Sequence, residues 1–340
     1  MAITYNKVDI RGVAAEPIFE EILFENNTIA KNLVTFEDDV KAETIFTEAT
    51  ATAVLQAYTC GVPTAQGSLN LFDSIVTPDK VMFYQEFCPD TLRFSRFKRD
   101  MKAGAMNTMS GEFERLLIGG LYAKQISLAY ENAFWNGIKA TTKTAIAALT
   151  PGAAQNQVGA AEQTLAAGLT AGLTDGIISK MLYNASNAAQ VAGLGGRIKV
   201  VGTAITSANI KAEYSKIFAA LPAQVLAGTE QPIIYAPYSD RSIIIEANNV
   251  TSDFNRPFQV NDSATDFMFQ GVKIEFVPIP TNVRIAALKA HLIWATDLVS
   301  DFNAMEIDKI ANNRDDMFIK NVATLTAHVA NQRFNVLYVA

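Results

Sequence analysis

The sequence predicts a mixed α+β fold, and two observations lead to that prediction. A proline-free stretch at residues 111–137 repeats apolar residues at helical spacings, which is typical of one long amphipathic helix. Runs rich in β-branched and aromatic residues precede it at 54–63 and 81–88, and others follow it from 272 onward. With 340 residues, the chain is long enough to bury one or two hydrophobic cores.

The long helix has start and stop signals of its own. Ser110 can cap its first turn, where Glu112 and Glu114 are favourable beside the positive end of the helix dipole. Asn136-Gly137 supplies the stop. At about 1.5 Å per residue the helix would span about 40 Å. The predicted apolar stripe consists of Phe113, Leu117, Leu121, Leu128 and Trp135.

The N-terminal part of the sequence predicts an extended arm, followed by a pair of strands that leaves the body of the protein and returns to it, which we call the excursion. Pro17 can open a short amphipathic helix, which Asn26-Asn27 would end. The runs 54–63 and 81–88 then read as two strands joined by a tip too long for a tight hairpin. Because two strands alone are marginally stable in water, we expect the excursion to lie on its own subunit or on a neighbour.

The middle of the chain predicts an insertion and a helix. Residues 140–176 are rich in Ala, Thr, Gly and Gln and hold no aromatic residue, so we expect an exposed insertion. Residues 175–192 predict a helix with Ile178, Leu182 and Ala185 on one face. A dinucleotide-binding fingerprint needs strand, glycines and helix in that order. Here Gly193, Gly195 and Gly196 follow a predicted helix and precede a predicted strand, which is the reverse order. The glycines therefore predict a turn.

The C-terminal part alternates short helices and strands. Ser207 or Asn209 can cap a helix that Pro222 stops, and Asp253 to Asp266 reads as a polar loop. The remaining predicted elements are a strand at 197–205, a strand at 231–237, a helix at 239–249, strands at 272–280 and 283–295, and a terminal hairpin formed by 322–329 and 333–339.

Composition narrows the class of protein. Hydrophobic residues make up 49% and charged residues 18%, which hints that part of the surface is covered by other copies. A formal net charge of −6 argues against a protein that grips nucleic acid, because phosphate binding depends on a surplus of Lys and Arg. No segment is long and apolar enough for a membrane span, and the N-terminus lacks a signal-peptide core. We expect a cytosolic protein without a membrane partner.

A search for catalytic, cofactor-binding or metal-binding residues assigns none, so we expect no enzyme activity and no cofactor. His291 and His328 lie in apolar, strand-like runs and are expected to be packing residues. The tryptophans Trp135 and Trp294 are expected in the core. Four acidic residues are close together in the sequence: Asp297, Asp301, Glu306 and Asp308. They lack the spacing of a calcium-binding loop, so we expect them at solvated turns.

The chain has two cysteines. Cys60 and Cys88 lie near the start and the end of the predicted excursion. They could face each other across it and form a disulfide, or remain two buried free thiols. The sequence leaves both alternatives open.

With these elements in order, the chain resembles the major capsid proteins of tailed bacteriophages, whose fold encapsulin shells share. An arm and a two-stranded loop precede a long helix that ends in AYENAFWNG, at Ala129 to Gly137. A second helix then leads to the short strand QPIIYAP. A later strand is introduced by Phe269-Gln270-Gly271-Val272 and ended by prolines. The resemblance covers nearly the whole chain, except that the insertion at 140–176 has no clear counterpart.

The resemblance implies a domain plan and a set of partners. The implied parts are an N-terminal arm (1–50), an extended loop (51–92), a peripheral domain with the spine helix 111–137 and the insertion (93–225), an axial domain (226–285), and returning peripheral strands (286–340). The implied role is a virion shell of hexamers and pentamers around double-stranded DNA, with portal and scaffolding or decoration proteins as further partners.

Two alternatives stay open at the level of sequence. An encapsulin-type compartment shell would share the fold and would carry cargo enzyme instead of DNA. A soluble α/β enzyme with an unrecognised site would run as a small oligomer, whereas a shell protein would run as rings or larger assemblies.

Overall fold

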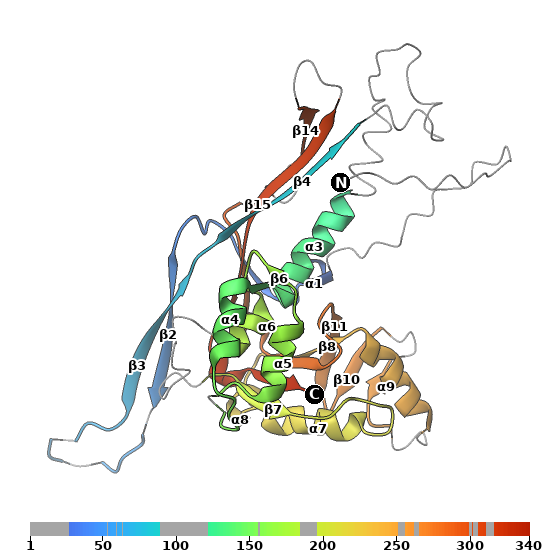
Figure 1. The fold of residues 1–340 in the computed structure, drawn as a ribbon. Coiled ribbons are helices and arrows are strands. Elements are labelled where there is room, and N and C mark those ends of the chain that lie inside the picture. Colours follow the sequence, from blue (N-terminus) through green and yellow to red (C-terminus); the bar gives the residue numbers. More distant parts are fainter. Residues whose placement is uncertain are drawn as a thin grey trace.

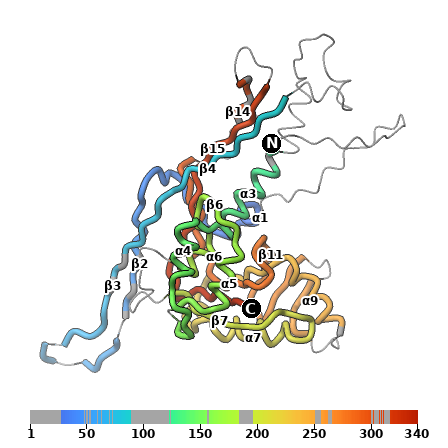
Figure 2. The backbone as a smooth tube through the Cα atoms, in the orientation of Figure 1, coloured from blue at the N-terminus to red at the C-terminus, as the bar shows by residue number. Residues whose placement is uncertain are grey.

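A computed structural model describes residues 27–52, 54–58, 60–62, 64–88, 122–155, 157–183, 196–250, 256–261, 265–298, 301, 305–310 and 316–340. This part of the chain forms two large sheets with helices packed on them, and a slender two-stranded ribbon that projects from the body (Figure 1). Figure 2 follows the same path as a tube, with the ribbon in blue and the C-terminal strands in red. Within the described ranges, no helix is long and apolar enough to cross a membrane.

The first sheet is built around one long strand, β15 (Met317–Val329). Its N-terminal part lies between β4 (Asp79–Phe87) and β14 (Met305–Lys309), and its C-terminal part pairs with β13 (Leu292–Ala295). The short β1 (Thr35–Glu37) runs parallel to β13. The strand predicted at 81–88 is therefore confirmed as β4, but its partner comes from the C-terminal part of the chain.

The second sheet has seven strands in the order β7, β16, β12, β8, β11, β10, β9. The bounds are β7 (Ile198–Val201), β8 (Ile233–Pro237), β9 (Gln259–Val260), β10 (Phe267–Phe269), β11 (Val272–Val277), β12 (Val283–Ala287) and β16 (Val336–Val339). Three helices, α7 (Ile210–Ala220), α8 (Ala223–Leu226) and α9 (Ser239–Val250), bury a hydrophobic cluster with this sheet.

Most local signals in this half of the chain are confirmed. Asn209 precedes α7, and Pro222 follows its end. The strand β8, the helix α9 and the strand β11 lie where the sequence predicts them, whereas β7 is shorter than predicted. The predicted polar loop at 253–266 is only partly described, and it contributes the short strand β9 and the buried Phe258 to the sheet and its core.

Two predictions near the C-terminus are wrong. The predicted strand at 283–295 is divided into β12 and β13 by the 3₁₀ turn η6 (Lys289–His291), and the two strands belong to different sheets. The predicted terminal hairpin does not form, because β15 and β16 also belong to different sheets. Asn331, with a φ of 46°, and the 3₁₀ turn η8 (Gln332–Phe334) redirect the chain between them. Alternating apolar residues show that a run is a strand but not which strand it pairs with.

The central helix is α3 (Ala123–Asn136), and it ends at Gly137 as predicted. The part predicted at 111–121, with three stripe residues and Ser110, lies outside the described residues. Trp135 is fully buried, but Leu128 is only half-buried. The buried face of the described helix instead centres on Ile126, Tyr130 and Phe134, which are four residues apart. The predicted stripe is therefore misplaced around the helix axis.

The prediction of an exposed insertion at 140–176 is wrong. The segment forms α4 (Ala140–Ala148), α5 (Ala160–Gly168) and β6 (Ala171–Gly172), which pairs in parallel with β5 (Ile138–Lys139). Ile146 and Leu165 are buried in the main core. Alanine is the strongest helix former, so an Ala-rich segment with an apolar residue once per few turns can fold as short packed helices. Low complexity is therefore not a sign of a loop here.

The helix predicted at 175–192 is present as α6 (Ile177–Leu182), and Ile178 and Leu182 are fully buried. Tyr183 is already extended, so the helix is shorter than predicted. The predicted positions Ala185, Gly193 and Gly195 lie outside the described residues. Gly196 belongs to no helix or strand.

The N-terminal predictions need two corrections. Residues 1–26 lie outside the described chain, and Asn27, predicted as a helix end, begins the short α1 (Asn27–Ala30). The projecting ribbon consists of β2 (Thr44–Thr52) and β3 (Ser68–Val76), whereas the described residues of the predicted strand at 54–63 form no strand. The predicted arm therefore already contains one ribbon strand.

Candidate interaction surfaces

The ribbon presents one face that is almost entirely apolar. Directly opposite residues in an antiparallel pair share a face. The register places Ile45 opposite Ile75, Ala49 opposite Leu71, and Ala51 opposite Leu69. The four larger side chains of this set are between 49% and 66% exposed. Thr47 and Asp73 form the one polar pair among them, with a hydrogen bond of 2.8 Å from the hydroxyl to the carboxylate. We call the side chains of these eight residues the apolar ribbon face.

The opposite face of the ribbon packs against the body at its root. Phe46 stacks on His328 of β15, and Val76 is buried. The root packs in a small cluster of its own, around Val40, Ile293 and Ala295, separate from the two large cores. The ribbon is packed at its root, and its strands project away from the body in Figure 1.

The tip that joins the two ribbon strands is the most exposed apolar part of the described chain. Leu55, Tyr58 and Val62 are 102%, 90% and 97% exposed. We call residues 54–67 the ribbon tip. Cys60 is exposed at this tip and Cys88 follows β4, and neither cysteine forms a disulfide. The alternative in which they face each other across two paired strands therefore does not hold, since β4 pairs with β15.

A second exposed surface, partly apolar and partly charged, lies on the outer face of the sheet formed by β4 and β15. Met82 lies opposite Val322, and Tyr84 stacks on Phe318 with ring centroids 5.8 Å apart. Met82, Tyr84 and Val322 are all exposed. The other face of the same strands is buried against α3 and packs residues such as Val81 and Ile319 into the body. The outer face therefore places these apolar side chains beside the charged Lys80, Glu86 and Lys320.

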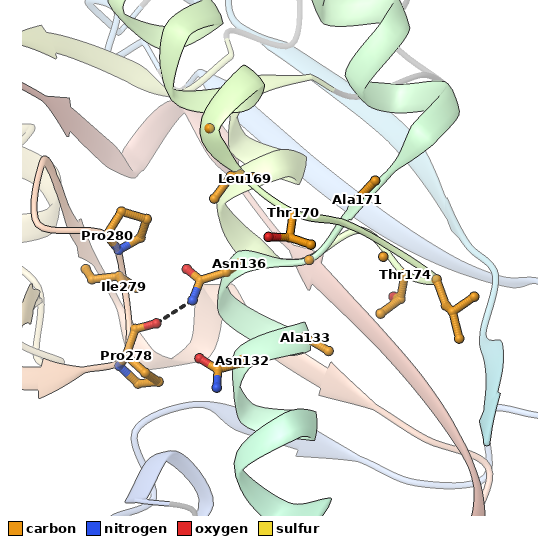
Figure 3. Close-up of a pocket in the computed structure, with 14 residues that line it drawn as sticks. Asn132, Ala133, Asn136, Leu169, Thr170, Ala171, Thr174, Pro278, Ile279 and Pro280 are labelled. Carbon is orange, nitrogen blue, oxygen red and sulfur yellow. Dashed lines mark hydrogen bonds between the residues drawn. The ribbon is translucent and has the colours of Figure 1, made fainter. Parts of the chain in front are cut away.

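A cavity of about 520 Å³ opens where α3 ends (Figure 3). Its walls come from the last turn of α3, from the segment through β6, and from Pro278 to Pro280. The Asn136 side chain crosses between two of these walls, and its Nδ2 donates a hydrogen bond of 2.5 Å to the Pro278 carbonyl oxygen. Its Oδ1 atom is buried and has no hydrogen-bond partner in the described part of the chain.

The two histidines considered for chemistry in the sequence are both buried packing residues. His291 is buried, and its Nδ1 lies 2.9 Å from Asn335 Oδ1. His328 is buried in β15, where burial and, next, the nearby Lys180 lower its pKa to about 4. Glu306 and Asp308 are exposed on β14. Among the described residues, no three His, Cys, Asp or Glu side chains gather as a metal site.

The buried charges form structural pairs. Arg284 of β12 donates from Nε to Asp240 Oδ2 at 2.8 Å, and the Tyr214 hydroxyl donates to the same oxygen at 2.7 Å. Arg197 pairs with Glu162, and both side chains are fully buried. Neither pair lines the cavity at the end of α3, and each joins two elements of the body, so we interpret both as structural ion pairs. Both tryptophans are also core residues, and Trp294 stacks on Phe134 with centroids 4.4 Å apart.

Comparison with known proteins bears on the fold. Neither a protein-family model nor a curated protein matches the sequence. Among solved structures, the capsid of an empty GTA particle matches with a TM-score of 0.55 at 12% identity, over 99% of this chain and 94% of the other. The structure of Mycobacterium phage Bobi matches at 0.53 and 10%, over 97% and 95%.

The capsid of the cyanophage P-SCSP1u matches with a TM-score of 0.52 at 10% identity, over 98% of this chain and 93% of the other. At identities this low, the likeness lies in the fold and not in particular residues. It extends over nearly the whole of each chain. The chain thus has the α+β fold of the capsid proteins of tailed bacteriophages.

Proposed function

We propose that this protein is the structural shell subunit of a tailed-phage virion, assembled in the host cytoplasm and without enzymatic activity. The observation that carries this proposal is the projecting ribbon. It has two nine-residue strands, no third strand among the residues that the structure describes, and an exposed apolar face. Burying one large aliphatic side chain contributes about 1.5–3 kcal/mol, so covering this face would stabilise an assembly considerably. Its fold supports the same role, since the similar structures are capsids.

The outer face of β4 and β15 is the surface that best complements the ribbon. It exposes Met82, Tyr84 and Val322 among charged side chains, and β4 has the same nine-residue length as each ribbon strand. A ribbon from one copy on this face of the next is a heterologous contact, because two different surfaces meet. Such contacts close into rings when the rotation between copies allows it. Hexamers and pentamers are the rings from which a closed icosahedral shell is built.

The negative net charge of the chain is compatible with a shell that encloses DNA without binding it tightly. With 28 basic and 34 acidic side chains, the subunit carries a formal charge of −6 and repels phosphates weakly. The proposed shell encloses double-stranded DNA without sequence-specific binding. Portal protein and scaffolding or decoration proteins are its further proposed partners, and no membrane is involved.

Shortening the ribbon tests the proposal. Thr50 pairs with Asn70, so replacing residues 51–69 with Asn-Gly would close the strands with a two-residue turn and keep the root. We expect the full chain to form closed particles by electron microscopy. The shortened chain should keep its circular dichroism spectrum but form no particles. Particles formed equally well by the shortened chain would contradict the role of the ribbon. A full chain that never exceeds a small oligomer would contradict the shell function.

A further inference from the structure

The second sheet ends at β7, and one edge of this strand faces away from the sheet. In the part of the chain that the structure describes, β7 pairs with β16 alone. The backbone N–H groups of Ile198 and Gly202 donate toward β16. Because successive residues of a strand direct their hydrogen bonds to opposite sides, the peptide groups of Lys199 and Val201 face the outer edge. Such an edge is a template on which a strand of another chain can add.

A glutamine side chain occupies the centre of this edge. The backbone N–H of Lys199 donates a hydrogen bond of 2.6 Å to Gln155 Oε1, and Gln155 Nε2 donates one of 3.1 Å to the Lys199 carbonyl oxygen. A primary amide carries an acceptor oxygen and N–H donors, as a peptide group carries one of each. Gln155 therefore makes at Lys199 the two hydrogen bonds that a neighbouring strand would make.

The side chain of Lys199 holds the turn that carries Gln155. This turn, residues 152–158, connects α4 to α5, and we call it the edge turn. Lys199 Nζ donates a hydrogen bond of 2.7 Å to the Gly152 carbonyl oxygen. The backbone N–H of Gly152 donates to the Val158 carbonyl oxygen at 3.0 Å, and Val158 is buried in the main core. The backbone and the side chain of one residue thus fix the edge turn against β7, which lies next to α5 in Figure 1.

The sequence of β7 explains why this edge needs cover. It reads Ile-Lys-Val-Val, so three of its four residues are β-branched and favour strand pairing. Val201 is 59% exposed. Lys199 places no charge at the edge, because its side chain is only 5% exposed. Edge strands are commonly protected from pairing by exposed charges, by proline or by a covering segment, and here a covering segment is present.

We propose that the edge turn is a cap that keeps β7 of one copy from pairing with β7 of a second copy. Gln155 takes the place of the next strand, and Lys199 holds the cap closed. A second copy is the partner that the cap excludes, since two like edges can pair about a two-fold axis. This inference goes beyond the proposed shell function, because it concerns a contact that the fold prevents. It also gives a role to a segment that the sequence marks only as an insertion.

Hydrogen exchange of the full chain, resolved by residue, tests the contact itself. Gln155→Met keeps the length of the side chain but removes both hydrogen bonds. We expect the Lys199 amide to exchange at least about threefold faster, because it loses its acceptor. The Ile198 amide should keep its rate, since it donates on the β16 side. The control Gln224→Met, at an exposed position of α8, should change neither rate. Unchanged exchange at Lys199 in Gln155→Met would overturn the inference.

Removing the edge turn tests the consequence. Replacing residues 153–157 with Asn-Gly joins Gly152 to Val158 by a two-residue turn and removes Gln155. We expect at least about threefold more irregular aggregate than from the unmodified chain, measured by light scattering and electron microscopy. Adding Val201→Pro should reverse this increase, because proline removes an N–H group that faces the edge and none that is bonded to β16.

Two outcomes of this second experiment would overturn the inference. One is equal aggregation of the unmodified chain and the chain with the replaced turn. The other is an increase that Val201→Pro leaves unchanged, since the copies would then associate through another surface. Both are read whether or not closed particles form, so the shell function is tested separately.

Discussion

The ring of Phe46 stacks on the ring of His328, with centroids 5.2 Å apart and planes 20° apart. Phe46 belongs to the ribbon and His328 to the longest strand of the body, so this contact joins the two parts. A small cluster around Val40 and Ile293 supports it. A unit held by few buried contacts opens at lower free energy than the rest of a protein. The root is therefore the place where the inclination of the ribbon can be changed.

His328 should make the stability of the folded subunit depend on pH. Burial, and next the cation of Lys180 on α6, lower its pKa from 6.5 to about 4. Above pH 6.5 the residue is neutral in both states and contributes nothing. Between pH 6.5 and 4 only the unfolded chain takes up the proton, so stability falls as pH falls, by about 1.4 kcal/mol per unit. The expected loss is about 3 kcal/mol, and below pH 4 it grows no further.

The measurement is the free energy of unfolding against pH for the ribbon-shortened subunit. His328→Phe keeps a ring against Phe46 and should remove this part of the loss. Lys180→Met removes the repelling cation, so it should raise the pKa of His328 and shrink the loss. A stacked imidazolium would gain about 0.5–2 kcal/mol from the Phe46 ring, but burial outweighs it because the pKa is lowered. The same pH dependence in all three proteins would show that His328 is not responsible.

Much of the second sheet could be predicted from sequence because its signals are local. Asn209 and Pro222 bound α7, and Pro278 follows the end of β11, whatever these elements later contact. Strand pairing could not be predicted in this way. The run at 81–88 is a strand, but nothing within it shows that its partner is β15. Pairing depends on residues far apart in the chain, and alternation carries no information on which ones meet.

The candidate surfaces were only partly predictable. The excursion itself is visible in the sequence, but the run containing Leu55 and Val62 was interpreted as a strand, and the structure shows it as an exposed tip. Strand preference largely reports how a side chain fits a packed surface, so an apolar run without a partner in its own copy looks like a strand. The run at 44–52 is rich in Thr, a β-branched residue favoured in strands, and that signal could have identified β2. Nothing local identifies the cavity at Asn136, because three distant segments form it.

Adjacent positions on the ribbon should respond differently to a charge. Leu69 lies on the apolar ribbon face, and Ser68 is exposed on the opposite face. Leu69→Asp should leave the subunit folded, because Leu69 contacts little in its own copy. It should lower particle yield by tenfold or more, since a buried unpaired charge costs several kcal/mol in each contact. Ser68→Asp should assemble nearly normally. Equal yields by electron microscopy would show that this face is not buried in the assembly.

The central helix offers a second matched pair. Ile126 is buried and Gln125 is exposed, although they are neighbours on α3. Ile126→Asp places a charge without a partner in the main core, at a cost of several kcal/mol. We expect insoluble protein or a large fall in unfolding temperature. Gln125→Asp should remain soluble, with a change within about 0.5 kcal/mol. Comparable solubility and melting of the two variants would mean that the buried face of α3 is assigned incorrectly.

Salt should separate assembly by apolar contacts from assembly on DNA. With a formal charge of −6, copies of the subunit repel one another weakly at neutral pH, and physiological salt screens this repulsion beyond about 8–10 Å. Raising ionic strength should therefore increase particle yield or leave it unchanged. Contacts to phosphates would behave in the opposite way, because salt competes with Lys and Arg for them. The measurement is the yield of closed particles from purified subunits at several salt concentrations, with and without DNA. Assembly that requires DNA and fails at moderate salt would contradict the proposal that apolar contacts hold the shell together.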